Sequence, residues 1–456
     1  METFSQALSE RVPLALAVLE LFDHVFDERL LDSIYEADRG RCYTDTLTFS
    51  QLIVLVRDAL VHHQGSGHQM FTQLVRNDAQ PVDESNFYRK LQRMPVLVSR
   101  ALLRTCSRRM AELMPTDAVS LPDCFASFRA VVIDGKKIKN AAKRLELTRG
   151  FSGSLIGAKA LVAMDARHGL ALAMSDSLDG LTNDLPLVES LVPQVLETIG
   201  VDPILWMADR QFGNVKTFQK LSGRPIDRFV IRIQKGLPFK AISRRETIDE
   251  QGRKVIDETG VFGNDKQSMP VRRITLERPG EKDDVILVTD LLDEQMYPAC
   301  ELLKLYRHRW GIEQMFQQVT ETFALDHLIG CAPQAILFQF ALCLLMYNLI
   351  QVVKSFVAED GNMAMLMVST YGLFYDVKRE LGIWAYLGDG CIVRTPRTAQ
   401  QMRNRLRKLL HDSWDAVAYL KASDKKPRKK RPPPKRLHGG HTSTQRLLEG
   451  RAKVIQ

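Results

Sequence analysis

The chain has 456 residues, of which 45% are hydrophobic and 26% are charged, and this composition excludes a chain too polar to bury a core. Its length is enough for about three domains. The formal net charge of +9 comes from residues 421–456, which hold twelve Lys and Arg against two Asp and Glu, while the remainder is nearly neutral. Such a basic segment is typical of a protein that binds a polyanion such as nucleic acid.

The sequence lacks the patterns of exported, membrane-spanning and zinc-binding proteins. The first apolar run has no basic segment before it and is interrupted by Glu20. The longest apolar stretch, residues 335–353, carries Gln339, Asn348 and Gln351, which favours a buried core helix over a membrane span. The seven cysteines form no CxxC pair, so we expect neither a disulfide framework nor a zinc site. We therefore expect a cytoplasmic protein, associated with the nucleoid if it binds DNA, and no membrane partner.

Residues 1–118 have the periodicity of amphipathic helices and predict a helical domain. Within it, Ser85 is a candidate cap for a short helix that presents Arg89 and Lys90, and the next helix starts at Pro95. This arrangement resembles a DNA-binding helix-turn-helix, although any basic amphipathic helix has the same features.

The pattern changes to strands alternating with helices from about residue 125. A β-branched run ends at Asp134, two further strands turn at residues 167–169, and a helix closed by Gly200 precedes a strand that ends at Asp209. A helix and a strand at 228–233 follow. The alternation predicts a mixed α/β domain.

Residues 234–290 break this rhythm with short alternating strands, which favours a β-rich insertion over a continuation of the sheet. The helix that follows places Tyr306, Arg309 and Glu313 on one stripe, because spacings of three and four residues share a helix face. The alternative is that Arg309 and Glu313 are a solvated ion pair worth a few tenths of a kcal/mol.

Three carboxylates are the candidate catalytic residues. Asp134 and Asp209 end strands, where ligands bind in open α/β sheets, although Asp134 suits a turn and Asp209 suits a helix cap. Together with Glu313 they form a set of oxygen ligands that suits Mg²⁺. Two such ions can promote phosphoryl transfer, and a cation and a phenol on the same helix can hold the phosphate backbone.

Six segments carry a resemblance to a known family: "VVIDGKK", "GAKALVAMD", "GLTNDLPLVESLV", "LWMADRQFGNVKTFQKL", "RFVIRIQKG" and "LYRHRWGIEQMF". In this order, over about 125–330, they resemble the DDE transposases of the insertion-sequence-four group. The resemblance implies a ribonuclease-H-like core with a β-rich insertion, and a metal-binding triad of Asp134, Asp209 and Glu313 that holds Mg²⁺, with Mn²⁺ as a substitute. Tyr306 and Arg309 would begin the Tyr-Arg-Glu-Lys signature, whose lysine is replaced here by Thr320.

The resemblance also implies double-stranded DNA as the partner, both terminal inverted repeats and target DNA, bound by a homodimer in the synaptic complex. Relatives that form a hairpin flip a base onto an aromatic residue of the insertion, where this chain has only Phe239 and Phe262, so the hairpin step stays open. Trp310 is a candidate for base stacking, although core packing is the commoner role of a lone tryptophan. The residues expected to contact DNA are Tyr306, Arg309, Trp310, Lys136, Lys137, Arg89, Lys90, Arg428, Lys429, Lys430 and Arg431.

The expected organisation is a helical DNA-binding domain at 1–118, a ribonuclease-H-like catalytic domain at 119–330, a helical region at 331–420 and a disordered basic tail at 421–456, for which a solubilising role is the alternative. The expected function is a transposase that cuts the ends of its element and joins them to target DNA. The alternatives are a metal-dependent nuclease that never joins DNA, and a transposase-derived DNA-binding protein with impaired catalysis, which Thr320 hints at.

Overall fold

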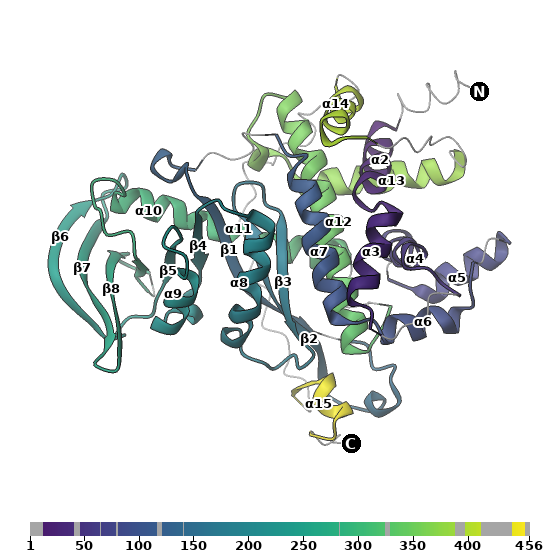
Figure 1. Cartoon of the computed structure of the whole chain (residues 1–456), viewed down its shortest axis with the longest axis horizontal. Coiled ribbons are helices and arrows are strands. Elements are labelled where there is room, and N and C mark those ends of the chain that lie inside the picture. Colours follow the sequence, from purple (N-terminus) through teal and green to yellow (C-terminus); the bar gives the residue numbers. More distant parts are fainter. Residues whose placement is uncertain are drawn as a thin grey trace.

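A long mixed sheet beside a helical body makes up the fold (Figure 1), here a computed structural model. The structure describes residues 12–40, 46–63, 65–78, 81–115, 121–139, 141–281, 283–323, 329–387, 397–411 and 440–451. In these residues the sheet has ten strands in the order β10-β2-β1-β4-β5-β9-β8-β7-β6, with β3 paired to β2. The strands are β1 (Arg129–Lys139), β2 (Ser154–Asp165), β3 (Ala171–Ser177), β4 (Ile204–Ala208), β5 (Arg228–Arg232), β6 (Phe239–Ile248), β7 (Lys254–Asn264), β8 (Gln267–Leu276), β9 (Val285–Thr289) and β10 (His441–Ser443).

Strand β1 lies in the centre of the part of the sheet formed by strands β1 to β5. It runs parallel to β4 and antiparallel to β2, and β4 runs parallel to β5. The sequence predicted that the first strand ends at Asp134, and this is wrong, because β2 supplies antiparallel partners as far as Lys139. Asp134 is therefore a mid-strand residue at the point where the pairing with β4 stops.

The β-rich segment extends the sheet instead of forming a separate module. Strands β6 to β9 form an antiparallel meander, and β9 pairs with β5, so the expectation of a break in the sheet is wrong. The sequence also missed β6, whose side chains are mostly polar and exposed because it is an edge strand. A buried ion pair joins the middle of the meander, where Arg272 Nε donates to Asp257 Oδ1 at 2.7 Å.

The predicted helices before residue 118 are present. They are α2 (Pro13–Val25), α3 (Glu28–Asp38), α4 (Phe49–His62), α5 (Gly67–Arg76), α6 (Glu84–Gln92) and α7 (Val96–Ala111). The expected cap at Ser85 is wrong by two residues, because Asp83 precedes α6 and its carboxylate accepts a hydrogen bond from the Ser85 backbone N–H at 2.9 Å. Pro95 directly precedes α7, close to its predicted place.

The C-terminal helices pack against the N-terminal ones in one helical body (Figure 1). They are α12 (Pro333–Asp360), α13 (Thr370–Leu387) and α14 (Ala399–Leu410). Their buried side chains share one apolar core with α2 to α7, although the sequence suggested two separate regions. The remaining helices lie along the catalytic part or in connections: α8 (Leu185–Ile199), α9 (Val215–Leu221), α10 (Ala299–Tyr306), α11 (Trp310–Thr322), α15 (Thr444–Leu448), and the short 3₁₀ helices η1 (Asp123–Phe125), η2 (Glu146–Thr148), η3 (Arg210–Phe212), η4 (Arg307–Arg309) and η6 (Met365–Met367).

Helix α12 is the apolar stretch that the sequence interpreted as a core helix. It is the one helix in the described part of the chain long and apolar enough to cross a membrane, and its apolar window is entirely buried inside the protein. Asn348 in its middle accepts a hydrogen bond from the Ala171 backbone N–H at 2.9 Å and donates one to the Ala171 carbonyl at 2.8 Å. These bonds satisfy the amide where α12 covers the sheet, which supports the core-helix interpretation.

Part of the predicted disordered tail is folded. Strand β10 pairs in parallel with β2, and α15 follows it directly. Ser443 Oγ accepts a hydrogen bond from the Gly180 N–H at 3.1 Å, and Arg446 Nε lies 2.8 Å from Asp179 Oδ2. Disorder is therefore a wrong prediction for residues 440–451, whereas the basic run at 428–431 lies outside the described residues.

Candidate active site

The two candidate aspartates lie side by side at the ends of a parallel strand pairing. Ile133 of β1 pairs with Ala208 of β4, so the next residue on each strand is Asp134 and Asp209. Neighbouring strands are about 5 Å apart, which brings the two carboxylates to one edge. Asp209 also accepts a hydrogen bond from the Gln211 N–H at 3.0 Å and caps η3, so its capping and its site position coexist.

The helix that carries Glu313 packs across β1. Helices α10 and α11 are joined by η4, so the predicted single helix contains one tighter turn. Lys136 Nζ of β1 donates to Thr320 Oγ1 of α11 at 2.9 Å and lies 5.6 Å from the Phe316 ring centroid. This contact sets α11 across the strand that carries Asp134, with Glu313 in the first turn of α11.

Arg309 and Glu313 form an ion pair whose arginine is buried and whose glutamate is partly exposed, so it is not the fully solvated pair of the alternative interpretation. Arg309 Nη2 lies 2.6 Å from Glu313 Oε1, and the arginine side chain is 7% exposed against 39% for the glutamate. Arg309 Nε is buried and has no hydrogen-bond partner among the described residues. Burying a guanidinium is costly unless charges surround it, and the carboxylates of the site supply them.

Burial raises the pKa of both aspartates, and a neighbouring carboxylate adds to the effect in each case. Burial raises the pKa of Asp134 to about 6, and the charge of Asp209 adds to this effect, while Arg309 opposes it. Burial also raises the pKa of Asp209, where Asp184 adds repulsion and Arg309 again opposes it. The charge of Glu313 also contributes to the higher pKa of Asp134.

The carboxylates do not form a ready metal cage. In the described parts of the chain, no group of three or more His, Cys, Asp and Glu side chains could hold a metal ion. Glu313 is engaged by Arg309, so it would have to turn to join the aspartates. The donor chemistry nevertheless fits a hard divalent cation, because two oxygen ligands with raised pKa values repel each other and a cation would relieve that repulsion.

Tyr306 and Trp310, both expected to contact DNA, differ in burial. Tyr306 is buried and its hydroxyl donates to the Ala208 carbonyl at 3.0 Å, so it braces the end of β4 and the expected phosphate contact is wrong for this arrangement. Trp310 is 56% exposed, so the alternative of core packing is wrong, and its contact with DNA stays a prediction. The Arg309 guanidinium lies 5.1 Å from the Trp310 ring centroid, which leaves the indole beside the site as a surface for stacking.

A hollow of 810 Å³ opens beside the two aspartates. Its lining combines the carboxylates with several lysines and with polar residues of the segment before α8: Asp134, Lys136, Lys137, Lys139, Lys159, Thr182, Asn183, Asp184, Asp209, Gln211 and Thr320. Lys137 is exposed here, as a DNA contact requires. The sequence missed Lys159, Asp184 and Gln211, because a polar run before an apolar helix is the ordinary pattern of a helix start.

The basic helix α6 has one of its two predicted contacts on the surface. Arg89 is exposed, and its Nη1 donates to Asn86 at 3.3 Å. Lys90 instead donates to the Leu47 carbonyl and lies 4.9 Å from the Tyr35 ring centroid. A DNA contact from Lys90 is therefore wrong for this arrangement, because its ammonium packs against the helical body.

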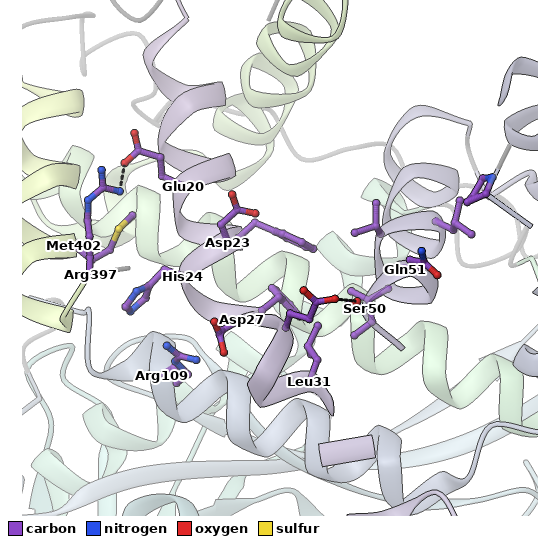
Figure 2. A pocket seen from close by; sticks show the side chains of 17 residues that line it. Glu20, Asp23, His24, Asp27, Leu31, Ser50, Gln51, Arg109, Arg397 and Met402 are labelled. Atoms are coloured by element: carbon purple, nitrogen blue, oxygen red, sulfur yellow. Dashed lines mark hydrogen bonds and ion pairs between the residues drawn. The ribbon is translucent and has the colours of Figure 1, made fainter. Parts of the chain in front are cut away.

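A second hollow lies in the helical body and contains none of the three candidate carboxylates (Figure 2). It measures 630 Å³ and is lined mainly by α2, α3 and α4. Glu20 on its wall is paired with Arg397 at 2.7 Å, and Ser50 donates to Glu28 at 3.1 Å. The charged groups of this hollow thus tie α2 to the segment before α14 and α3 to α4.

Comparison with known proteins gives a family for the part of the chain that contains this site. Residues 126–349 match the transposase DDE domain. A protein from Sinorhizobium fredii (strain NBRC 101917 / NGR234), provisionally named transposase y4zB, is 26% identical over 130 residues, which cover 27% of this chain and 35% of that protein. A solved piggyBac transposase synaptic complex with hairpin DNA aligns over 87% of this chain and 85% of its own at 12% identity, with a TM-score of 0.40, which carries no conclusion about this chain. The chain therefore contains a segment, residues 126–349, that matches the transposase DDE domain family.

Proposed function

We propose that this protein is a DNA transposase that cuts DNA at the ends of its element and joins the freed ends to target DNA. The observation that carries the proposal is the meeting of Asp134 and Asp209 at one edge of parallel strands, inside the segment that matches the DDE domain. The order β3-β2-β1-β4-β5, in which three antiparallel strands adjoin two parallel ones, supports a ribonuclease-H-like core. The narrower assignment to the insertion-sequence-four group rests on the sequence motifs.

Asp134, Asp209 and Glu313 are the residues that would hold Mg²⁺, or Mn²⁺ in its place. When bound, the ions would activate the attacking oxygen and stabilise the leaving oxygen of a phosphoryl transfer. Tyr306 keeps the end of β4 in place through the Ala208 carbonyl, which fixes the backbone just before Asp209. Arg309 holds Glu313 and offsets the repulsion between the carboxylates before the ions bind.

The partners we propose are double-stranded DNA, both terminal inverted repeats and target DNA, and a second copy of the chain in the synaptic complex. The lysines that line the hollow beside the aspartates support this proposal, because phosphates of a DNA strand at the site would need cations there. Lys136 also bears on the alternative of impaired catalysis. Its ammonium lies at Thr320, the place on α11 where the signature expects a lysine, so a positive charge is present there.

The test is an assay with purified protein, Mg²⁺ and DNA that carries the sequences flanking the gene. A transposase cuts at the element ends and joins a pre-cut end to a second DNA, whereas a nuclease gives only cut products. Asp209→Ala should abolish both reactions and leave end binding within about twofold, because the residue acts on the chemistry. Cutting without joining by the wild type would favour the nuclease, and binding without cutting would favour a DNA-binding protein.

A further inference from the structure

A polar cluster that combines a buried ion pair with the exposed residue Gln211 lies in the wall of the hollow beside the two candidate aspartates. It consists of Lys159 on β2, Asp184 at the start of α8 and Gln211 in η3. Lys159 Nζ lies 2.6 Å from Asp184 Oδ1, and Gln211 Nε2 donates to Asp184 Oδ2 at 2.7 Å. The side chains of the ion pair are only 6% and 5% exposed, so the charges are held away from water.

One arm of the cluster reaches Asp209. Gln211 donates from its side chain to Asp184 and from its backbone N–H to Asp209 Oδ1, the latter at 3.0 Å. A single residue thus links the buried ion pair to a candidate metal ligand. Asp184 thus holds the side chain of the residue whose backbone N–H donates to the Asp209 carboxylate.

Asp184 also packs closely against Gly135, the residue after Asp134. A Cβ atom on Gly135 would lie 2.2 Å from Asp184 Oδ1 and 2.6 Å from Oδ2, so only glycine fits against this carboxylate. The Gly135 N–H in turn donates to Asp134 Oδ1 at 2.7 Å. Asp184 therefore touches the backbone that positions Asp134 as well as the side chain that positions Asp209.

Asp184 precedes α8, where an aspartate ordinarily caps the helix. Here its carboxylate makes no side-chain cap bond to any described residue of α8 and faces the cluster instead. Stability alone also gives little reason for the arrangement, because a buried ion pair is often no better than apolar side chains of the same volume. An ion pair can, however, fix the orientation of neighbouring groups such as metal ligands.

We infer that Lys159, Asp184 and Gln211 are positioning residues that hold the backbone and side chains of Asp134 and Asp209 in place for the metal-dependent reaction. We call these three residues the relay. Asp184 is its central residue, and Gln211 connects Asp184 to Asp209. Lys159 supplies the positive charge that compensates the Asp184 carboxylate beside the site. This inference rests on the proposed function.

The experiment compares Gln211→Met and Asp184→Asn with Asp176→Asn as the matched control. Gln211→Met removes the side-chain donor and keeps the backbone N–H. Asp176 is a buried aspartate of the same sheet, paired with Arg100, but it belongs to β3 and touches neither candidate ligand. Metal binding is followed by Tb³⁺ luminescence and by displacement of Tb³⁺ with Mg²⁺, and cleavage of end DNA is measured in parallel with DNA binding.

We expect both relay variants to lose about 10- to 100-fold in metal affinity and cleavage, the usual effect of removing a partner that orients a metal ligand. End binding should stay within about twofold. Asp176→Asn should keep the metal affinity of the wild type even if its melting temperature falls as much as that of Gln211→Met or Asp184→Asn. Equal metal affinity in the wild type and both relay variants, or an equal loss in the control, would overturn the inference. If the wild type fails to cut DNA, the proposed function fails, while the Tb³⁺ titrations still report on positioning.

Discussion

Replacing Asp134 with asparagine should stabilise the metal-free protein at alkaline pH. Burial and the charge of Asp209 raise the pKa of Asp134 from 3.8 to about 6. The native state therefore holds this proton more tightly than the unfolded state, and the free energy of unfolding falls as pH rises through that interval. A shift of roughly two units corresponds to about 3 kcal/mol at most, because one unit is worth about 1.4 kcal/mol.

Asparagine has nearly the same shape and carries no charge, so Asp134→Asn avoids this cost. In EDTA at about pH 8 the variant should unfold at a melting temperature a few degrees above the wild type, and at about pH 5 the difference should shrink. Mg²⁺ should stabilise the wild type and leave the variant unchanged, because a ligand stabilises only the protein that binds it. Thermal unfolding at both pH values, with and without Mg²⁺, measures all three effects.

Two buried aspartates outside the site provide matched controls. Burial acts to raise the pKa of Asp165, but its hydrogen bond with His168 and the charge of Arg129 outweigh burial and hold the pKa well below the ordinary range. Asp165→Asn should therefore destabilise the protein at about pH 8, the opposite sign. Asp290, whose pKa burial raises to about 6, should respond to asparagine as Asp134 does but keep the stabilisation by Mg²⁺. If Asp134→Asn lowers the melting temperature as Asp165→Asn does, the Asp134 charge stabilises the fold and the reasoning is refuted.

Three further changes test the site and the sheet. Lys136→Met should weaken binding of cut DNA ends and reduce the slope of log affinity against log salt concentration by about 0.9. Adding Thr320→Lys to this variant should restore both the affinity and the slope. If fluorescence anisotropy shows an unchanged slope, Lys136 does not contact DNA. Gly135→Ala should cut cleavage and metal affinity together in the Tb³⁺ assay, because its methyl would lie 2.2 Å from a carboxylate oxygen; full activity would refute that close packing. Arg272→Met should cost about 3–5 kcal/mol in urea unfolding by leaving Asp257 buried without its partner, and Asp257→Leu in the same chain should recover most of the loss.

The part of the site that follows from general rules of sheets was predictable. Parallel strands place their carboxyl ends at one edge, so Asp134 and Asp209 were expected to meet, and Ile133 does pair with Ala208 beside them. Burial was not predictable from spacing. An arginine four residues before a glutamate has the same sequence pattern on any helix, and only packing of α11 against β1 makes Arg309 a buried cation.

Contacts between distant segments left no sequence signal. Lys159 and Asp184 are separated by a strand and a turn, and they meet only because α8 packs against the strands that precede it. Strand β10 is three residues long and depends on β2 for its hydrogen bonds, so composition alone predicted disorder there. The sequence thus predicts elements with strong local periodicity and misses pairs and short strands whose stability comes from tertiary contacts.

The positive charge that the Tyr-Arg-Glu-Lys signature expects on the helix at position 320 is supplied here by Lys136 on strand β1. Lys136 lies two residues after Asp134 on β1, so both side chains point to the same face of one strand. At Lys136 this strand is paired with β2, opposite Ala160, and the pairing supports the lysine. Thr320 then accepts a hydrogen bond from the Lys136 ammonium, and the positive charge lies on the strand of the candidate aspartate Asp134. Because the charge is relocated and kept, the substitution is compatible with a working transposase, and the paired exchange at these two positions is the measurement that decides it.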